Sequence, residues 1–278
     1  MLKSIFTTLI PIVLLSATAM GQDDDVKGGV YKKTNSMTKK FAPYTPLTER
    51  DVMWSKRIWR TMDLKEKINH PFYFPTESHG SMNSLFSVIR NHIKASELTV
   101  YDAIDDEFTI ELTRTAAQTI GDQSEIIYIE DELTGELIGK EIPNPLYSGD
   151  VMRFRIKEDW FFDRQRSVMD VRIIGICPVI EVKDSNDDYK GELPMYWVYF
   201  PEVRPMLARQ RTINRWNDAE QRNYDDLFVK RFFSSYVYKE SNVYNRRVTD
   251  YKAGIDALIE AQDIHNKIAN FEQDLWEY

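Results

Sequence analysis

The sequence predicts an α+β fold with a mostly antiparallel sheet, because a β-rich centre is flanked by helical patterns on both sides. Within residues 151–200, apolar and polar side chains alternate with a period of two, as in strands with one buried face. Residues 48–94 and 205–278 instead carry apolar side chains at roughly helical spacing. We therefore expect a central meander, over about residues 151–200, between N-terminal and C-terminal helices.

The start of the chain predicts export. Lys3 and the apolar run of residues 5–15, followed by small residues, form the pattern of a secretory signal peptide over residues 1–21. A membrane anchor is the alternative, but the run is shorter than the roughly 20 apolar residues that a transmembrane helix needs. No cysteine stands at the cleavage site to accept a lipid. We expect a mature protein that is exported and released in soluble form.

Residues 22–46 show no apolar periodicity and predict an extended N-terminal arm. Two interpretations remain open for this arm. It is a disordered tail, or it docks onto a surface through its aromatic side chains, which are Tyr31, Phe41 and Tyr44. The remaining residues, 47–278, predict a single α+β domain.

Residues 48–94 predict two helices. Thr48 and Asp51 resemble a capping box, and the apolar residues that follow at roughly helical spacing are Val52, Ile58, Trp59 and Met62. This helix should end before His70 and Pro71, because the residue before a proline avoids helical geometry. Ser81 should open the second helix, whose apolar stripe comprises Leu85, Phe86, Ile89 and Ile93.

Residues 98–204 predict strands. Phe108, Ile110 and Leu112 alternate with polar residues, and residues 126–130 and 137–142 flank a Leu-Thr-Gly turn at 133–135. Three meander strands follow, with turns expected at residues 163–166 and 185–191. The side chains expected to be buried in the meander are Met152, Phe154, Ile156, Met169, Val171 and Ile173.

Residues 205–278 predict three helices. The first spans the arginine-rich residues 206–222, and the last runs from about residue 250 to 277. The middle helix has an apolar stripe of Leu227, Phe228, Phe232, Tyr236 and Val237. The stripe of the last helix comprises Ile264, Ile268, Phe271 and Leu275.

The residues that usually carry catalysis are dispersed. The four histidines lie far apart without ligand spacing, and no phosphate-binding loop or nucleophile elbow is present. Cys177, the single cysteine, lies in the most apolar strand and should be an inert buried thiol. Glu158 and Asp159 are adjacent, so in a strand they point to opposite faces. These patterns therefore assign no catalytic, cofactor-binding or metal-binding residue and no cofactor.

Charge argues against nucleic acid as a partner. Removing residues 1–21 takes away Lys3 and no acidic residue, so 35 basic and 44 acidic side chains remain, a net charge of −9. An acidic protein does not attract a polyanion. Two other functions stay open from the residues alone. One is a secreted hydrolase with dispersed carboxylates. The other is a carbohydrate-binding module that uses Trp160 or Trp197 as a platform.

Aromatic and arginine side chains gather at the end of the first meander strand. Phe161 and Phe162 are adjacent and cannot both enter one face of a strand, so one should point away from the core. Aromatic side chains beside arginines are typical of interface hot spots. The candidate interface therefore comprises Trp160, Phe161, Phe162, Arg164 and Arg166.

Six segments of the chain carry a resemblance to a known family. They are DVMWSKRIWR at 51–60, KINHP at 67–71, KEDWFFD at 157–163, WVYFPE at 197–202, YDDLF at 224–228 and KESN at 239–242. In these segments the sequence resembles the GldN/PorN family of gliding-motility and type IX secretion proteins of Bacteroidota. The resemblance covers most of the mature chain and contains no catalytic motif.

The resemblance implies a structural subunit of a periplasmic ring that is needed for protein export, and hence a protein that is not an enzyme. Such a subunit would assemble with a GldK/PorK-like outer-membrane lipoprotein and associate with further copies of itself. It would also contact the periplasmic part of a GldM/PorM-like inner-membrane motor protein. We therefore expect a periplasmic protein that is peripherally associated with the outer membrane.

Overall fold

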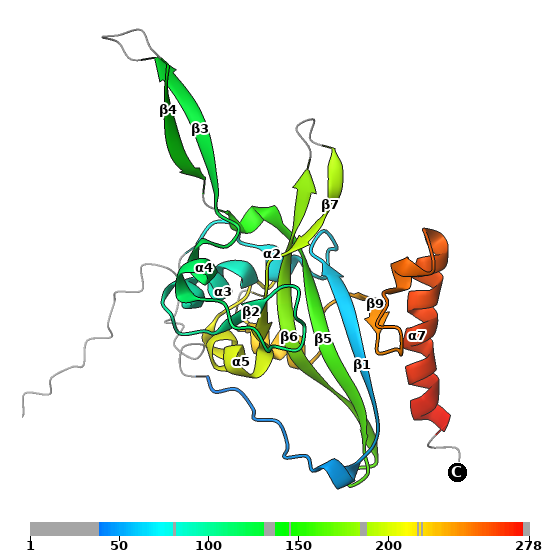
Figure 1. The fold of residues 1–278 in the computed structure, drawn as a ribbon. Helices are drawn as coiled ribbons and strands as arrows, with labels where there is room; N and C mark the ends of the chain where they lie inside the picture. Colours follow the sequence, from blue (N-terminus) through cyan, green and yellow to red (C-terminus); the bar gives the residue numbers. More distant parts are fainter. Residues whose placement is uncertain are drawn as a thin grey trace, which may run out of the picture. The chain divides into compact units, whose positions relative to one another are not determined.

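The computed structural model describes residues 39–79, 82–130, 137–144, 146–183, 188–215, 217 and 219–274 (Figure 1). The predicted signal peptide and the arm as far as residue 38 lie outside the described residues. Residues 35–278 cluster as one compact unit. The predicted α+β class with a mostly antiparallel sheet is confirmed.

A seven-stranded sheet organises this unit. Its strand order is β2-β8-β6-β5-β1-β9, β7 pairs with β6, and every pairing is antiparallel. The strands are β1 (Val52–Asp63), β2 (Val100–Asp102), β5 (Val151–Asp163), β6 (Val168–Lys183), β7 (Tyr189–Pro194), β8 (Tyr196–Tyr199) and β9 (Tyr236–Glu240). A separate hairpin pairs β3 (Gln123–Glu130) with β4 (Leu137–Asn144), as predicted. Its tip at 131–136 lies outside the described residues.

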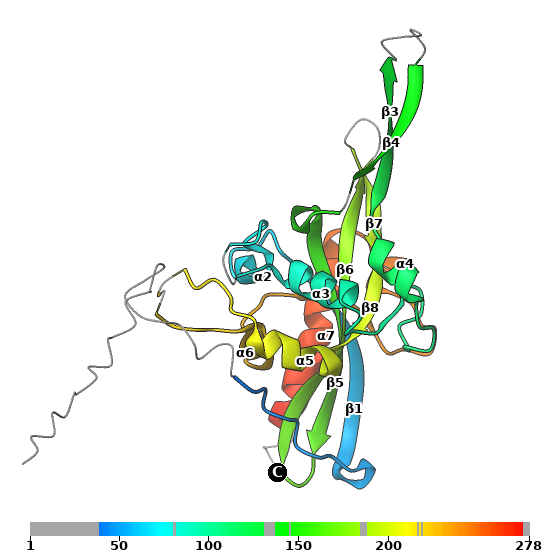
Figure 2. The ribbon, with the colours of Figure 1, turned by 90° about the vertical axis from the view of Figure 1, so that its left-hand side faces the viewer.

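Six α-helices accompany the strands in the described part of the chain. They are α2 (His70–Tyr73), α3 (Leu85–Lys94), α4 (Arg114–Thr119), α5 (Phe200–Arg209), α6 (Tyr224–Val229) and α7 (Ile255–Asp274). Three short 3₁₀ turns are η1 (Glu49–Asp51), η2 (Ser148–Asp150) and η3 (Val248–Asp250). Figure 2 shows α3 and α5 beside the sheet in a second view.

The predicted meander is confirmed as β5, β6 and β8. A turn at residues 164–167 joins β5 to β6, close to its predicted place. Part of the second predicted turn is strand β7, and residues 184–187 lie outside the described residues. Phe154, Ile156 and Ile173 are buried as expected. Three others, Met152, Met169 and Val171, are only partly buried.

The first predicted helix is wrong, because Val52–Asp63 is strand β1, paired with β5 on one side and β9 on the other. Ile58 and Met62 are four residues apart, a spacing that fits both a helix and one face of a strand. Trp59 is buried on the opposite face of β1, at 4% exposure. Both faces are therefore covered, and the polar alternation that identifies a strand is absent.

Helix α3 confirms the second predicted helix with a later start. Ser84 caps it by accepting the backbone N–H of Ser87, whereas the predicted first residue, Ser81, lies outside the described residues. All four residues of its predicted stripe are buried. This stripe faces the main hydrophobic core, where it joins side chains from β5, β6, α5 and α6.

The strand predicted over Phe108, Ile110 and Leu112 reduces to one antiparallel bridge, between Glu111 and Tyr101 of β2, and Phe108 takes no part in it. The Asp105 carboxylate accepts the backbone N–H groups of Glu107, Thr109 and Ile110, which gives this segment an alternative to strand pairing. Phe108 has a left-handed backbone, with φ of 58°. Residues 103–111 thus form a loop that brings the Phe108 ring to the sheet face holding Trp197.

The C-terminal region is less helical than predicted. Helix α5 already ends at Arg209, and most of the predicted 206–222 helix is irregular. Helix α6 ends near Arg231, whose φ of 55° turns the chain away. The chain then forms β9, in which Val237 pairs with Arg60 of β1. Strand pairing therefore replaces the helix predicted through Tyr236 and Val237.

The last predicted helix is confirmed as α7, which runs alongside β9 in Figure 1. Ile264 and Ile268 of the predicted stripe are buried, Phe271 is partly buried, and Leu275 lies outside the described residues. The buried side chains of α7 form a second cluster with Ile58 and Val237. The main core and α7 consequently cover one face of the sheet. The Phe108 loop, which comprises residues 103–111, covers the other face.

Replacing Gly175 with alanine should destabilise the fold. An alanine Cβ at Gly175 would lie 2.5 Å from a ring carbon of Phe108 and 3.3 Å from Trp197. Overpacking of this kind costs about 1–3 kcal/mol, which urea unfolding would measure. Gly191→Ala is the matched control, because its Cβ would meet nothing within 4 Å. Equal losses for both substitutions would show that Phe108 does not occupy the space over Gly175.

Candidate functional site

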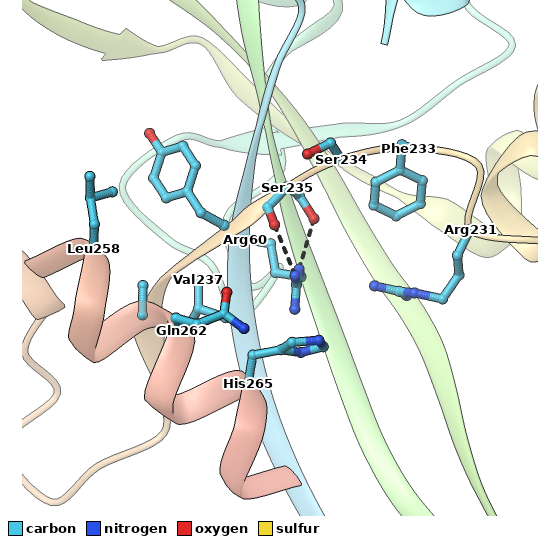
Figure 3. A pocket seen from close by; sticks show the side chains of 11 residues that line it. Arg60, Arg231, Phe233, Ser234, Ser235, Val237, Leu258, Gln262 and His265 are labelled. Carbon is cyan, nitrogen blue, oxygen red and sulfur yellow. Dashed lines mark hydrogen bonds between the residues drawn. The ribbon is translucent and has the colours of Figure 1, made fainter. Parts of the chain in front are cut away.

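A cavity of about 400 Å³ lies between β1, β9, residues 231–236 and helix α7 (Figure 3). Its side chains come from both ends of the sequence, because β9 pairs with β1 and α7 packs beside β9. The floor is formed by the guanidinium of Arg60. The α7 side is formed by Leu258, Gln262 and His265, of which Leu258 and Gln262 are exposed.

Arg60 is buried at the cavity floor, with 7% of its surface exposed. Its Nε donates to Ser235 Oγ at 2.8 Å, and its Nη2 donates to the Ser235 carbonyl at 2.9 Å. Nη1 has no hydrogen-bond partner among the described residues. Burial lowers the pKa of Arg60, since the charged form has lost hydration. Strand β1 places the guanidinium of Arg60 on its apolar face, between Ile58 and Met62.

Glu158 of β5 is the buried carboxylate of this region and is 0% exposed. It accepts hydrogen bonds from Arg231 Nη1 at 2.9 Å, Arg231 Nη2 at 3.2 Å and Trp160 Nε1 at 3.1 Å. The Arg231 guanidinium also lies 5.3 Å from the centre of the Trp160 ring. Glu158 is thus fully engaged by Arg231 and Trp160, and Arg60 forms no ion pair with it.

His265 closes the cavity from α7. Figure 3 shows its ring directed toward the guanidinium of Arg60. Burial lowers the pKa of His265, and the nearby positive charges of Arg60 and Arg231 lower it further. Its Nδ1 has no hydrogen-bond partner among the described residues. A neutral imidazole contributes no charge, so the region holds two arginines and one carboxylate, a net charge of one positive unit.

The arm is the second feature that joins distant parts of the chain. From Lys39 onward it is described, and it lies along α5 and α6, where Lys39 pairs with Asp226. Arg204 is 2% exposed and pairs with Asp225 through contacts of 2.7 and 3.2 Å. It also donates to the Ala42 carbonyl at 2.7 Å and lies 4.3 Å from the Tyr44 ring centre. The described part of the arm therefore docks within its own chain.

The five predicted interface residues are distributed over both faces of β5 and the turn that follows. Trp160 packs in the α7 cluster, 6.5 Å from His265 between ring centres. Phe161 is 4% exposed and lies 5.2 Å beneath the guanidinium of Arg172. Phe162 is partly buried. Neither phenylalanine is fully exposed, and Arg172 of the same chain covers Phe161.

Arg164 and Arg166, the remaining two predicted interface residues, lie in the exposed turn between β5 and β6. Arg166 donates to Asp163 at 2.7 Å and to Asp170 at 2.6 Å. Arg164 is held through its backbone N–H, which donates to the Asp51 carbonyl at 2.8 Å. This turn is therefore the most exposed part of the predicted interface.

Other candidates from the sequence are engaged within the fold. Asp159 accepts from Arg57 at 2.7 and 2.9 Å, on the opposite face of β5 from Glu158. Trp197 is 3% exposed, so its ring cannot serve as a flat platform for a sugar. No group of three or more metal-binding side chains occurs among the described residues. Within the same part of the chain, every helix is too short or too polar to cross a membrane.

Sequence reasoning missed Arg60 and Arg204 as organising residues. Arg60 stands two residues from both Ile58 and Met62, and a period of two would have placed it on their buried face. The incorrect helix assignment concealed this signal. Arg204 lies between Val203 and Pro205 with no local pattern that predicts its burial. Its partners, Ala42, Tyr44 and Asp225, lie far away in the sequence.

Comparison with known proteins gives one family. The family described as "Gliding motility associated protein GldN" matches residues 47–277, which include nearly all of the described residues. No curated protein matches the chain.

Replacing Tyr44 with alanine should loosen the arm. The substitution removes the ring that stacks on Arg204 and Arg172, at 4.3 and 5.1 Å from their guanidinium carbons. Cation–π contacts contribute about 0.5–2 kcal/mol, so tryptic cleavage at the exposed Lys40 should accelerate about 2- to 30-fold. Tyr189→Ala, at an exposed tyrosine of β7, is the control. An unchanged cleavage rate in Tyr44→Ala would contradict docking of the arm.

Cys177 should be unreactive in the native protein. It is 0% exposed, and burial raises the pKa of its thiol to about 12. Because the thiolate is the reactive form, labelling by a maleimide should be slow until denaturant is added. Cys177→Ala should cost about 1 kcal/mol of stability and retain secretion activity. Rapid native labelling together with loss of secretion would assign the thiol a functional role.

Proposed function

The chain belongs to the GldN family of gliding-motility-associated proteins, and we propose that it is a non-enzymatic structural subunit of a periplasmic ring in the type IX secretion and gliding machinery. Family membership, which rests on a match over residues 47–277, is the observation that carries this proposal. The family is associated with gliding motility and type IX secretion. We propose three further points, which are the role as a ring subunit, the partners, and the requirement for this chain in protein export.

The arrangement of polar side chains supports a structural role. Glu158 and Asp159, the carboxylates that could be imagined as a catalytic pair, point to opposite faces and are each engaged by an arginine. The long ladders of β1, β5 and β6 form a rigid support. Such an arrangement suits a structural subunit, because burial on the sheet faces fixes the register of the strands.

The proposed partners follow from the family. The protein would reach the periplasm through the signal peptide at 1–21 and associate with the outer membrane through a GldK/PorK-like lipoprotein. Further copies of the chain would complete the ring, and a GldM/PorM-like motor protein would contact it from the inner membrane. We assign the exposed turn at residues 164–167 to one of these contacts, since it is the accessible part of the predicted interface.

Cell fractionation tests the proposed attachment. The mature protein should be recovered with the outer membrane when the lipoprotein is present and in the soluble periplasmic fraction when it is deleted. Recovery with the membrane in both strains would contradict peripheral attachment through this partner. Secretion of type IX cargo should be lost when the chain is deleted. Unchanged secretion would contradict a required role in export.

Charge reversal tests the assigned turn. Arg164→Glu should reduce co-purification of a ring partner at least tenfold while leaving the melting temperature within about 1 °C, because Arg164 is exposed. Arg114→Glu, at an exposed arginine of α4, is the control for the added negative charge. Full co-purification of the partner with the Arg164→Glu variant would contradict the assignment of this turn to the interface. A large fall in melting temperature would instead assign Arg164 to the fold.

A further inference from the structure

We propose that the cavity beneath α7 binds an anionic group, a carboxylate or a phosphate, which pairs with Arg60. The cavity floor, its charge and its open hydrogen-bond donors all favour this ligand class. Anion binding at this place does not depend on the ring role, because every residue involved belongs to one chain.

The charge around the cavity is not balanced within the described part of the chain. Arg60 forms no ion pair there, and Glu158 already accepts three hydrogen bonds from Arg231 and Trp160. Removing a cation from water is costly unless a counter-ion or a full set of hydrogen bonds replaces its hydration. With 7% exposure, Arg60 lacks most of that hydration, so an incoming anion would recover free energy that burial has cost.

The guanidinium of Arg60 keeps one buried edge that has no hydrogen-bond partner among the described residues. Nε and one Nη2 proton are taken by the hydroxyl and carbonyl oxygens of Ser235. The second Nη2 proton and Nη1 remain, and together they form the end-on fork that matches the two oxygens of a carboxylate or phosphate. The Ser235 contacts fix the plane of the guanidinium, so little conformational entropy would be lost on binding.

Helix α7 supplies the opposite side of the proposed site. The ring of His265 faces Arg60, and its buried Nδ1 lacks a partner among the described residues (Figure 3). The amide nitrogen of Gln262, on the cavity margin, donates one proton to Asn266 Oδ1 at 3.0 Å and has a second proton to donate. An anion held in this way would contact both β1 and α7, and it would therefore strengthen the attachment of the helix to the sheet.

Thermal unfolding with added ions tests the proposal. Sodium phosphate, and separately sodium acetate, are compared with sodium chloride at equal ionic strength. Because a ligand that binds only the native state raises Tm, phosphate at about tenfold its Kd should raise Tm by roughly 3–5 °C. Arg60→Gln should abolish this rise, whereas Arg114→Gln, at an exposed arginine of α4, should retain it. A rise that Arg60→Gln retains would overturn the proposal.

A second substitution keeps the proposal testable if Arg60→Gln does not fold, or if free phosphate and acetate bind too weakly to raise Tm. Gln262→Glu places a carboxylate on the cavity margin without altering a buried residue. It should raise Tm above that of the wild-type protein, because residue 262 lies near the middle of α7, where the helix dipole contributes little. Stabilisation by Gln262→Glu without a phosphate effect would support a carboxylate supplied by another protein. No phosphate or acetate effect together with no gain from Gln262→Glu would overturn the site.

Discussion

The burial of both faces of the sheet is the constraint on which the rest of the structure depends. On one face of β5, Phe154 and Ile156 enter the main core, and on the other face Lys157 is 1% exposed. Glu158, the next residue, is also completely buried. A strand that carries charged side chains into two interiors needs a partner for each of them, because an unpaired buried charge costs several kcal/mol.

The peripheral segments are positioned by those partners. The Phe108 loop places the Asp106 carbonyl where Lys157 donates to it, and the turn after α6 brings Arg231 to Glu158. Breaking a buried pair by removing one member costs about 3–5 kcal/mol, whereas an exposed pair contributes about 0–1 kcal/mol. The exposed pair of Arg222 with Glu220 therefore adds little, and the buried contacts decide where the loop and the turn lie.

The same constraint explains which elements the sequence could predict. Strands β5 and β6 and helix α7 keep a recognisable period, so the meander and the last helix were predictable. Strand β1 has apolar side chains on both faces, so its sequence shows no period of two. For the same reason the burial of Arg60 was not predicted. Phe108 adopts a left-handed backbone and packs over Gly175, an arrangement that local sequence does not encode. The aromatic cluster at Trp160 to Phe162 was recognised, but its cover by Arg172 and α7 depends on contacts between distant residues.

The two ends of the described domain attach to the sheet by different kinds of contact. Arg204 and Arg172 hold the arm through hydrogen bonds to its carbonyl groups and through cation–π contacts with Tyr44, and Lys39 of the arm pairs with Asp226. These contacts are directional and depend on charge. Helix α7 instead packs through an apolar cluster with β1 and β9, beside the cavity that Arg60 lines. Attachment of the arm therefore responds to ions and to charged surfaces, whereas attachment of α7 depends mainly on the burial of apolar side chains.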